Sequence, residues 1–359
     1  MKKTLLATAI AGAMVYGATA AQAATVYDQD GTQVDVYGRI NIAAQTGGPE
    51  TGGSKASGSE IINNGSRFGF RARNEVSSDL SVFANAEFRF AADTRADQTL
   101  QTRSTFVGLD SDSMGRVTVG NFLSVYYTAV GSVFDVPQGP NAAVMMDGFG
   151  AVNSQADSIA YSTPNLEGFQ AHVQAQHYSG NNAPIGVEDN SSTTSWIGAV
   201  NYTWENLYLG LGYVQSKDLS ERGASADFGE RLNQEDLWGA TASYQFTPEF
   251  AARIKYEDWS TNADLDLPEG VVDGRVDNLW GLGGTFDYGM GNIYADYYRV
   301  RMVDEDQSSR NHWVLGATYR FSTPMFAYFE VVDFDFDTDQ AIADVNDDLE
   351  FTVGLRYDF

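Results

Sequence analysis

Several residue types are missing or scarce in this chain of 359 residues, which has no cysteine, 3 histidines and 8 prolines. Without cysteine, no disulfide can stabilise the protein. No histidine pair has the helical spacing of a zinc site, and no Gly-x-Ser-x-Gly motif is present. We therefore predict no catalytic residues, no metal site and no cofactor.

Basic residues are also few, with 22 Lys and Arg against 48 Asp and Glu and a formal net charge of −26. This excess of acid argues against nucleic acid as a partner and favours surfaces that attract cations. The densest acidic run spans Asp333 to Asp339 and continues from Asp344 to Asp348. Carboxylates at this spacing could bind a divalent ion, or they could belong to a solvated external loop.

Beyond the first residues the chain lacks any apolar run near the roughly 18 residues that a spanning helix needs. At the start, Lys2 and Lys3 precede an apolar stretch from Leu5 to Val15 and the small-residue site Ala21-Gln22-Ala23. This order predicts a secretory signal peptide over residues 1–23 and a mature domain over 24–359. The sequence thus indicates an exported protein without a helical anchor.

The last nine residues alternate strictly between apolar and polar side chains. One face of this predicted strand carries Phe351, Val353, Leu355, Tyr357 and Phe359, and the other carries Thr352, Gly354, Arg356 and Asp358. Similar aromatic–polar–aromatic endings recur upstream, at residues 202–204, 244–246, 286–288 and 319–321, each before a tight turn. A sheet between lipid and water has these features, with a ring of aromatic side chains at one interface.

Counting such alternating runs predicts an all-β, transmembrane antiparallel β-barrel of about 16 strands. The mean hydropathy of −0.29 suits strands that are half polar. A soluble sandwich or propeller also alternates, but it does not require an aromatic pair at every second strand end. The predicted strands are 33–45, 66–75, 80–90, 101–110, 115–121, 157–163, 168–178, 195–204, 207–216, 235–246, 250–259, 276–288, 292–303, 310–321, 325–334 and 349–359.

One long connection, residues 122–156, is far less polar than the other long loops. It is rich in Tyr, Phe, Val and Met, and it also carries the carboxylates Asp135 and Asp147. Apolar side chains need cover from water, and a sixteen-stranded barrel has a wide lumen. We therefore expect this loop, the third of the long loops, to fold inward and narrow the channel. A lid outside the barrel or a surface packed on a partner is the alternative.

Strand alternation also places four arginines on one side of the lumen. Arg39 lies on the first predicted strand, Arg67 and Arg71 on the second, and Arg103 on the fourth, where we expect it to share the inner face with Thr105. Glu87 points inward from the third. We interpret them as a basic wall of a pore, or as residues that pair with Glu87 and hold the barrel wall together.

Four segments carry a resemblance to the general diffusion porins of Gram-negative outer membranes, the matrix-porin family. They are Val34-Asp-Val-Tyr-Gly-Arg39, Ser66-Arg-Phe-Gly-Phe-Arg71, Thr102-Arg103 with Val107-Gly-Leu109, and Gly354-Leu-Arg-Tyr-Asp-Phe359. The resemblance covers essentially the whole chain after the signal peptide. It implies a homotrimer of sixteen-stranded barrels, a third loop that constricts each pore, and a last strand, with Tyr357 and Phe359, that is read by the outer-membrane assembly machinery.

The resemblance further implies a ladder of basic wall residues facing loop carboxylates. Arg39, Arg67, Arg71 and Arg103 match the basic positions, with Glu87, Asp135 and Asp147 as the acidic side. Two positions depart from the family pattern: Ser162 stands at a basic position, and Gln138 replaces the loop glutamate. The ion selectivity of the family therefore does not carry over.

Together these features predict a water-filled channel for passive diffusion of ions and small hydrophilic solutes, mildly selective for cations. A channel specific for a substrate such as a sugar, or a surface receptor or adhesin, are the alternatives. A specific sugar channel would need a ladder of aromatic side chains along the lumen. Expected partners include outer-membrane lipid and lipopolysaccharide, the latter bridged through divalent cations at acidic loops.

Overall fold

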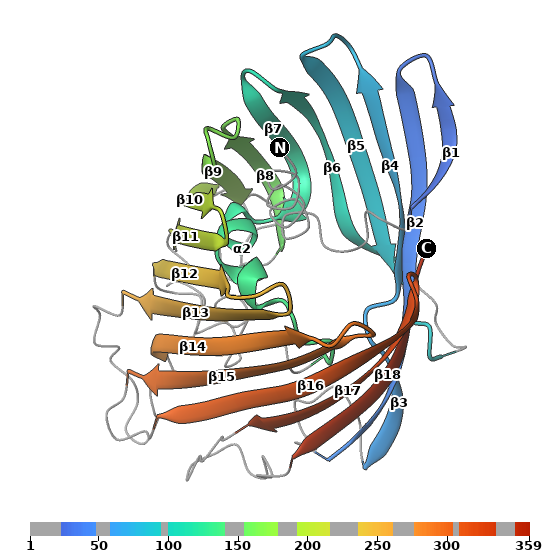
Figure 1. The fold of residues 1–359 in the computed structure, drawn as a ribbon. Coiled ribbons are helices and arrows are strands. Elements are labelled where there is room, and N and C mark those ends of the chain that lie inside the picture. The colour runs from blue at the N-terminus through green and yellow to red at the C-terminus, as the bar shows by residue number, and fades with distance from the viewer. Residues whose placement is uncertain are drawn as a thin grey trace.

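The computed structural model describes residues 23–47, 58–94, 100–140, 154–178, 192–215, 236–260, 276–303, 309–334 and 349–359. The predicted signal peptide lies outside these residues, except for Ala23. Eighteen strands of the described residues form one antiparallel sheet that curls into a barrel (Figure 1). The strands are β1 (Ala24–Gln29), β2 (Thr32–Thr46), β3 (Ser59–Asn63), β4 (Arg67–Glu75), β5 (Leu80–Arg89), β6 (Gln101–Ser111), β7 (Gly115–Leu123), β8 (Ser154–Ser162), β9 (Phe169–Tyr178), β10 (Thr193–Trp204), β11 (Leu207–Val214), β12 (Leu237–Gln245), β13 (Phe250–Trp259), β14 (Val276–Asp287), β15 (Asn292–Met302), β16 (Arg310–Ser322), β17 (Met325–Phe334) and β18 (Glu350–Asp358).

The barrel wall contains sixteen strands, because two of the eighteen continue others. β3 and β4 pair with successive halves of β2, so together they form one wall strand. β1 and β18 likewise pair with successive parts of β2. The pairing of β18 with β2, from Phe351 opposite Thr46 to Asp358 opposite Arg39, closes the ring. The sixteen-stranded antiparallel barrel predicted from the sequence is confirmed.

The two ends of the described chain meet beside β2. Ala24 pairs with Val36, while Phe359 exchanges two backbone hydrogen bonds with Gly38, of 2.7 and 3.0 Å. Ala24 and Phe359 therefore lie close together on the same side of β2. The role of Tyr357 and Phe359 as an assembly signal stays a prediction, although both rings lie on the outer face as expected.

Sequence patterning missed the β1–β2 hairpin, although its turn carries a clear signal. Asp30 and Gly31 both have positive φ angles, of 52° and 74°. An Asp-Gly pair at these angles suits the two-residue type I′ turn that joins hairpin strands. Glycine tolerates this backbone region without steric cost, and aspartate is among the few other residues that visit it.

Side chains alternate between the lipid-facing outside and the inside of the barrel. The aromatic strand endings lie on the outer face and form the ring that the sequence predicted. A second ring, which the sequence interpretation did not identify, follows the opposite ends of the strands. Its members include Trp196, Tyr213, Trp238, Tyr256, Trp280 and Tyr297. Two interfacial rings bound the apolar band of a membrane barrel.

Glycines on the inner face make room for large side chains from neighbouring strands. A Cβ at Gly354 would lie 2.1 Å from the Tyr328 ring, and one at Gly69 would lie 2.7 Å from the Tyr37 ring. The two rings therefore occupy the space that a side chain at these glycines would need. Tyr328 also donates a hydrogen bond of 3.0 Å to Asn41 on β2.

The short connections link neighbouring hairpins to one another. The Asp79 carboxylate in the β4–β5 turn accepts hydrogen bonds from the Ser111 and Ser113 hydroxyls, of 2.9 and 2.8 Å. The Ser113 N–H donates to the same carboxylate at 2.9 Å. These hydrogen bonds, led by that of Ser113, lower the pKa of Asp79 below its ordinary value because they stabilise the ionised form.

Residues 124–140, called the docked segment below, lie against the inner face of the barrel. They include helix α2 (Val125–Ala129) and the 3-10 helix η2 (Gly131–Phe134). Figure 1 shows α2 inside the ring, next to β10 and β11. None of the described helices is long and apolar enough to cross a membrane. Ser124 caps α2, its hydroxyl accepting a 2.9 Å hydrogen bond from the Tyr127 N–H.

Replacing Gly354 by valine should destabilise the barrel. The new side chain would displace the Tyr328 ring and weaken its hydrogen bonds, at a cost of about 1–3 kcal/mol for an overpacked site. The free energy of unfolding in urea, measured on detergent-folded protein, tests this. Gly198→Val is the matched control, because a Cβ there meets nothing within 4 Å. Equal stability of both variants would contradict the packing role of Gly354.

Candidate functional site

An apolar cluster fills one side of the barrel interior. Most of the docked segment's buried side chains belong to it, including Tyr126, Val130 and Phe134. The barrel wall contributes the remaining members, which lie on inward positions between β7 and β15. They are Phe122, Ala160, Ile197, Ala199, Tyr208, Leu237, Trp259, Val276, Leu279, Tyr298, Val300 and Met302.

Glycines let the docked segment approach the wall closely. A Cβ at Gly210 would lie 2.0 Å from the Ala129 carbonyl oxygen, and one at Gly239 would lie 1.9 Å from the Tyr126 hydroxyl. Tyr208 donates a 2.9 Å hydrogen bond to the Ala129 carbonyl. Glycine occupies wall positions where another backbone approaches, so any larger residue there would push the segment into the lumen.

Buried ion pairs line the wall behind the docked segment. Arg253 and Asp296 are 2.6 Å apart, and Lys255 and Glu257 are 3.1 Å apart, with almost no exposure to water. Glu257 also accepts a 2.8 Å hydrogen bond from the Tyr126 hydroxyl. Because buried charges are costly without partners, these pairs need each other and fix the position of Tyr126.

Glu330 on β17 anchors the far end of the docked segment. Its buried carboxylate accepts hydrogen bonds from the backbone N–H groups of Gln138 and Gly139, the latter at 2.5 Å, and from the Tyr294 hydroxyl. The Gln138 side-chain oxygen accepts a 3.1 Å hydrogen bond from Arg356. The segment therefore contacts the wall from β9 to β18, and Gln138 serves to attach it.

The opposite side of the interior carries a cluster that we call the arginine wall. It comprises Arg39, Arg67, Arg89, Arg103 and Arg356, together with the carboxylates Glu87 and Asp358. Arg103 lies 2.5 Å and Arg67 lies 3.7 Å from Glu87. Arg39 and Arg356 lie 3.0 and 2.9 Å from Asp358. Five arginines thus share two carboxylates, which leaves the wall positive.

The predicted wall residues meet here with two adjustments. Arg39, Arg67 and Arg103 gather near Glu87, but Arg71 instead lies over the Tyr37 ring, 4.7 Å from its centroid. Sequence analysis did not assign Arg89 or Arg356 to the wall, although alternation places both inside. The ion pairs of Arg67 and Arg103 with Glu87 also agree with the alternative interpretation, in which these arginines hold the barrel wall together.

The predicted orientation of Thr105 is wrong, and a β-bulge explains why. Glu87 pairs with Ser104 and Phe88 pairs with Thr102, so Arg103 is an extra residue in β6. Thr105 is exposed and pairs with Ala86, on the lipid-facing side. The bulge turns the Arg103 side chain inward, where it reaches Glu87. Strict alternation from Val107 and Leu109 would have turned Arg103 outward.

Of the predicted loop carboxylates, Asp135 lies at the exposed surface of the docked segment. It accepts a 2.5 Å hydrogen bond from the Tyr127 hydroxyl and interacts electrostatically with Arg39. Asp147 lies outside the described residues, and so does most of the acidic run from Asp333 to Asp348. Within the described ranges there is no group of three or more His, Asp or Glu arranged to hold a metal ion.

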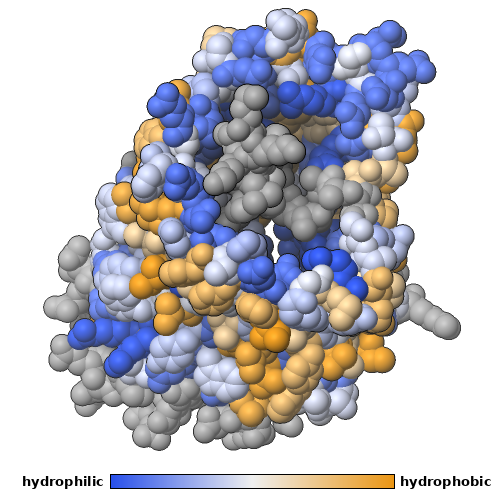
Figure 2. Space-filling model, in the orientation of Figure 1, coloured by the Kyte–Doolittle hydropathy of each residue, from blue (hydrophilic) through white to orange (hydrophobic). Residues whose placement is uncertain are grey.

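Basic side chains are divided unequally between the two faces of the sheet. Among the fourteen Lys and Arg that the structure describes, only Arg299 and Arg301 lie on outward positions of the strands. The remaining twelve lie on the inner face: Arg39, Arg67, Arg71, Arg73, Arg89, Arg103, Arg116, Arg253, Lys255, Arg310, Arg320 and Arg356. In Figure 2, hydrophilic side chains border an opening in the molecule, and an apolar patch covers the region of β16–β18.

Comparisons with known proteins agree with this architecture. The family model described as Gram-negative porin matches residues 7–339, and the chain belongs to this family. A monosaccharide porin of a Halomonas species is 29% identical over 95% of this chain and 97% of its own. The outer membrane porin PhoE of Escherichia coli is 23% identical over the full length of both chains. An anion-selective porin from Comamonas acidovorans has the same fold, with a TM-score of 0.63 at 16% identity, covering 91% of this chain and 100% of its own.

The protein is therefore an outer-membrane porin of the Gram-negative type. Porins are channels rather than enzymes, which agrees with the lack of catalytic motifs in the sequence.

Replacing Glu330 by glutamine should loosen the docked segment. An amide has one acceptor oxygen in place of two, so it cannot satisfy both backbone N–H groups and the Tyr294 hydroxyl. We expect a loss of about 1–3 kcal/mol in the free energy of unfolding and larger current fluctuations in single-channel recordings. Glu249→Gln, in an exposed turn, is the control. A Glu330→Gln channel as quiet and stable as the control would show that this anchor is dispensable.

Proposed function

We propose that the porin is a general diffusion channel whose constriction lies between the docked segment and the arginine wall. The observation that carries this proposal is the asymmetry of the interior. The apolar cluster occupies the side of β7–β15, so the open side for water and solutes is the one lined by Arg39, Arg67 and Arg103. Ions and small hydrophilic solutes would pass there by diffusion.

A sugar-specific channel is less well supported, although one relative carries the name monosaccharide porin. Three aromatic rings on the open side of the wall could have formed a track for sugar rings. Each is covered by a guanidinium: Tyr37 by Arg71 at 4.7 Å, Phe83 by Arg116 at 3.9 Å, and Phe326 by Arg356 at 5.2 Å. A covered ring offers no free face for stacking, which favours the general channel.

Removing Arg67 and Arg103 together, as Arg67→Ala with Arg103→Ala, should raise the preference for cations and widen the pore. A unit charge about 8 Å from an ion in water changes its energy by roughly 0.5 kcal/mol. The permeability ratio of potassium to chloride should therefore rise by about twofold or more, with a higher single-channel conductance.

Reversal potential and conductance in planar bilayers measure both effects. Arg299→Ala with Arg301→Ala is the matched control, because it removes the same two charges from the outer face. If the double variant behaves like this control, Arg67 and Arg103 do not face the permeation path.

For ion selectivity we propose that two opposing fields act on permeating ions. The arginine wall is positive and favours anions, whereas the external connections are acidic. Residues 335–348, for example, contain six Asp and no Lys or Arg. Charges at a channel mouth concentrate counter-ions over about one Debye length, roughly 8 Å at physiological ionic strength and longer in dilute salt. Mild cation selectivity is therefore expected where screening is weak.

The preference for potassium over chloride should accordingly be above unity in dilute salt and fall as salt is added. At about 1 M salt, where the Debye length is near 3 Å, only charges lining the constriction should still act, and the ratio should approach or drop below one. Reversal potentials across potassium chloride gradients at both ionic strengths provide the measurement. Anion preference in dilute salt would show that the arginine wall dominates throughout.

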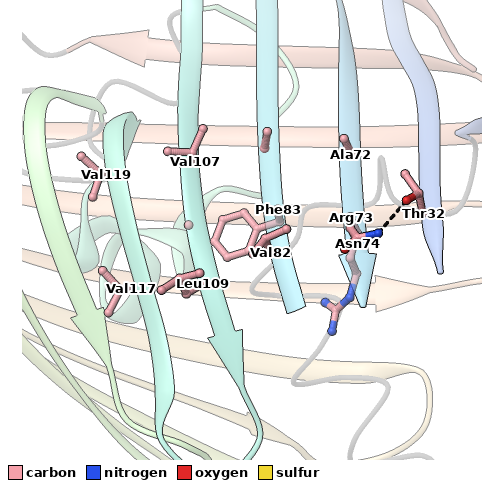
Figure 3. Close-up of a pocket in the computed structure, with 12 residues that line it drawn as sticks. Thr32, Ala72, Arg73, Asn74, Val82, Phe83, Val107, Leu109, Val117 and Val119 are labelled. Atoms are coloured by element: carbon pink, nitrogen blue, oxygen red, sulfur yellow. Dashed lines mark hydrogen bonds between the residues drawn. The ribbon is translucent and has the colours of Figure 1, made fainter. Parts of the chain in front are cut away.

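We further propose a homotrimer whose subunits meet through the outer face of β4–β7. A groove of about 460 Å³ crosses this face, lined by Ala72, Val82, Ala84, Val107, Leu109, Val117 and Val119 among others (Figure 3). These strands carry no Trp or Tyr, the residues that anchor a barrel at the level of the head groups. A barrel face covered by protein needs no such anchors. A structure of OmpT of Vibrio cholerae, 15% identical with a TM-score of 0.62, is described as a trimer form.

Val107→Trp should break this trimer, because a bulky side chain cannot fit a packed protein interface. Leu282→Trp is the matched control, since Leu282 faces outward on β14 with 59% exposure against 58% for Val107. Fluid lipid or detergent accommodates a tryptophan there. Native mass measurements should give monomers for the first variant and trimers for the second. Trimers of both would exclude β4–β7 as the interface.

A further inference from the structure

Two arginines stand apart from the remaining basic residues by facing the membrane. Arg299 and Arg301 occupy outward positions of β15, in line with Ile293, Ala295 and Tyr297. An arginine on the lipid face costs about 2–4 kcal/mol at the midplane of a bilayer and almost nothing near its interfaces. Two arginines on this face are therefore tolerated only if they lie near the interface or bind a ligand.

Their neighbours place them at the outer aromatic ring. Arg299 lies opposite Trp280 on β14 and opposite Asn311 on β16, and Arg301 lies opposite Asn278. The Tyr297 hydroxyl donates a 2.6 Å hydrogen bond to Asn311. Trp and Tyr mark the level of the lipid head groups, so both guanidinium groups are at head-group height. This end of the strands is opposite the short turns and hence external.

The two guanidinium groups are only partly neutralised. Arg301 lies 3.8 Å from the Asp277 carboxylate, and the Arg301 side chain is 62% exposed. Arg299 is exposed and forms no ion pair within the described residues. Asp258, the next carboxylate on this face, is engaged by the Tyr256 hydroxyl at 2.6 Å. The positive charge of Arg299 is thus uncompensated among the described residues. The exposed pair of Arg301 and Asp277 is weak, so a ligand that displaces it loses little free energy.

We propose that Arg299 and Arg301 form a binding site for the phosphate group of a phosphorylated outer-leaflet lipid. A guanidinium binds phosphate through two parallel N–H···O hydrogen bonds, and Arg is the preferred residue for this recognition. Arg299 would supply the principal contact, because Asp277 offsets part of the charge of Arg301. This inference concerns the outer surface and does not rest on the proposed pathway of solutes.

The surroundings favour a lipid over a free phosphate ion. Trp280 lies level with Arg299, and toward the barrel centre Leu282 and Leu315 give an exposed apolar surface below them. Acyl chains of the same lipid molecule would cover this surface while its phosphate meets the guanidinium groups. A free phosphate would gain the charge contact alone, which is weak in high dielectric.

Binding of lipid A, a glucosamine lipid with two phosphates, to the full folded barrel in phosphatidylcholine nanodiscs tests the proposal. The variants are Arg299→Gln, Arg301→Gln and the double variant, with Arg299→Lys as a conservative replacement. Arg310→Gln is the matched control, because Arg310 lies on the adjacent strand but on its inner face. Heat-modifiable electrophoretic mobility verifies that each variant is folded. If the double variant does not fold, the binding of Arg299→Gln alone tests the proposal.

The double variant should bind lipid A about thirty-fold more weakly, on the scale of one favourable contact per basic residue at an anionic surface. Arg299→Gln should account for most of the loss, Arg299→Lys should restore part of it, and the control should bind normally. All variants should bind dephosphorylated lipid A with equal affinity. Equal binding of the two lipids by the unaltered protein would overturn the proposal. Displacement of lipid A by micromolar inorganic phosphate would also overturn it, in favour of a free-anion site.

Discussion

A closed ladder of backbone hydrogen bonds is the constraint on which the whole molecule depends. Lipid offers no partner for an unpaired N–H or C=O group, so every strand needs two neighbours and the sheet has no free edge in the membrane. Closure in turn separates two solvents, with lipid outside and water inside. The alternation of side chains in each strand follows from that separation, as do the aromatic rings and the partition of charge.

Packing of the docked segment divides the barrel interior into an apolar side and a charged side. The docked segment brings apolar side chains that need cover, and β10–β15 provide it with glycines and with inward Tyr, Val and Met. What remains open is the wall where five arginines share Glu87 and Asp358. Under the proposed pathway, pore shape and pore charge have one origin, because the segment that covers one side also decides which residues the solutes meet.

Much of this was predictable from the sequence, since a period of two is easily recognised over ten residues. All sixteen wall strands lie close to their predicted ranges, and Arg39, Arg67 and Arg103 lie on neighbouring inner-face positions. The failures have local causes. A single extra residue at Arg103 reverses the orientation of everything beyond it, and only the pairing with β5 reveals that.

Residues 292–302 show a second limit, because neither alternation of this strand gives a purely apolar face. The structure resolves it: Tyr298, Val300 and Met302 face inward because the interior is apolar there, while Arg299 and Arg301 face outward at the level of the head groups. A pattern read for one strand assumes an apolar outside and a polar inside. The assumption fails wherever another segment packs within the barrel or where the outside is the interface itself.

The meeting of Ala24 and Phe359 beside β2 has a topological consequence. Their partners, Val36 and Gly38, are separated only by Tyr37, so the wall is a ring in which the gap between Ala24 and Phe359 is one cut among many. A short linker joining the two ends, with a new opening in an external connection, would leave all strand pairs intact. Circular permutants of this barrel should thus keep the same fold while changing which pair of strands closes it, and so separate the order of synthesis from the order of closure.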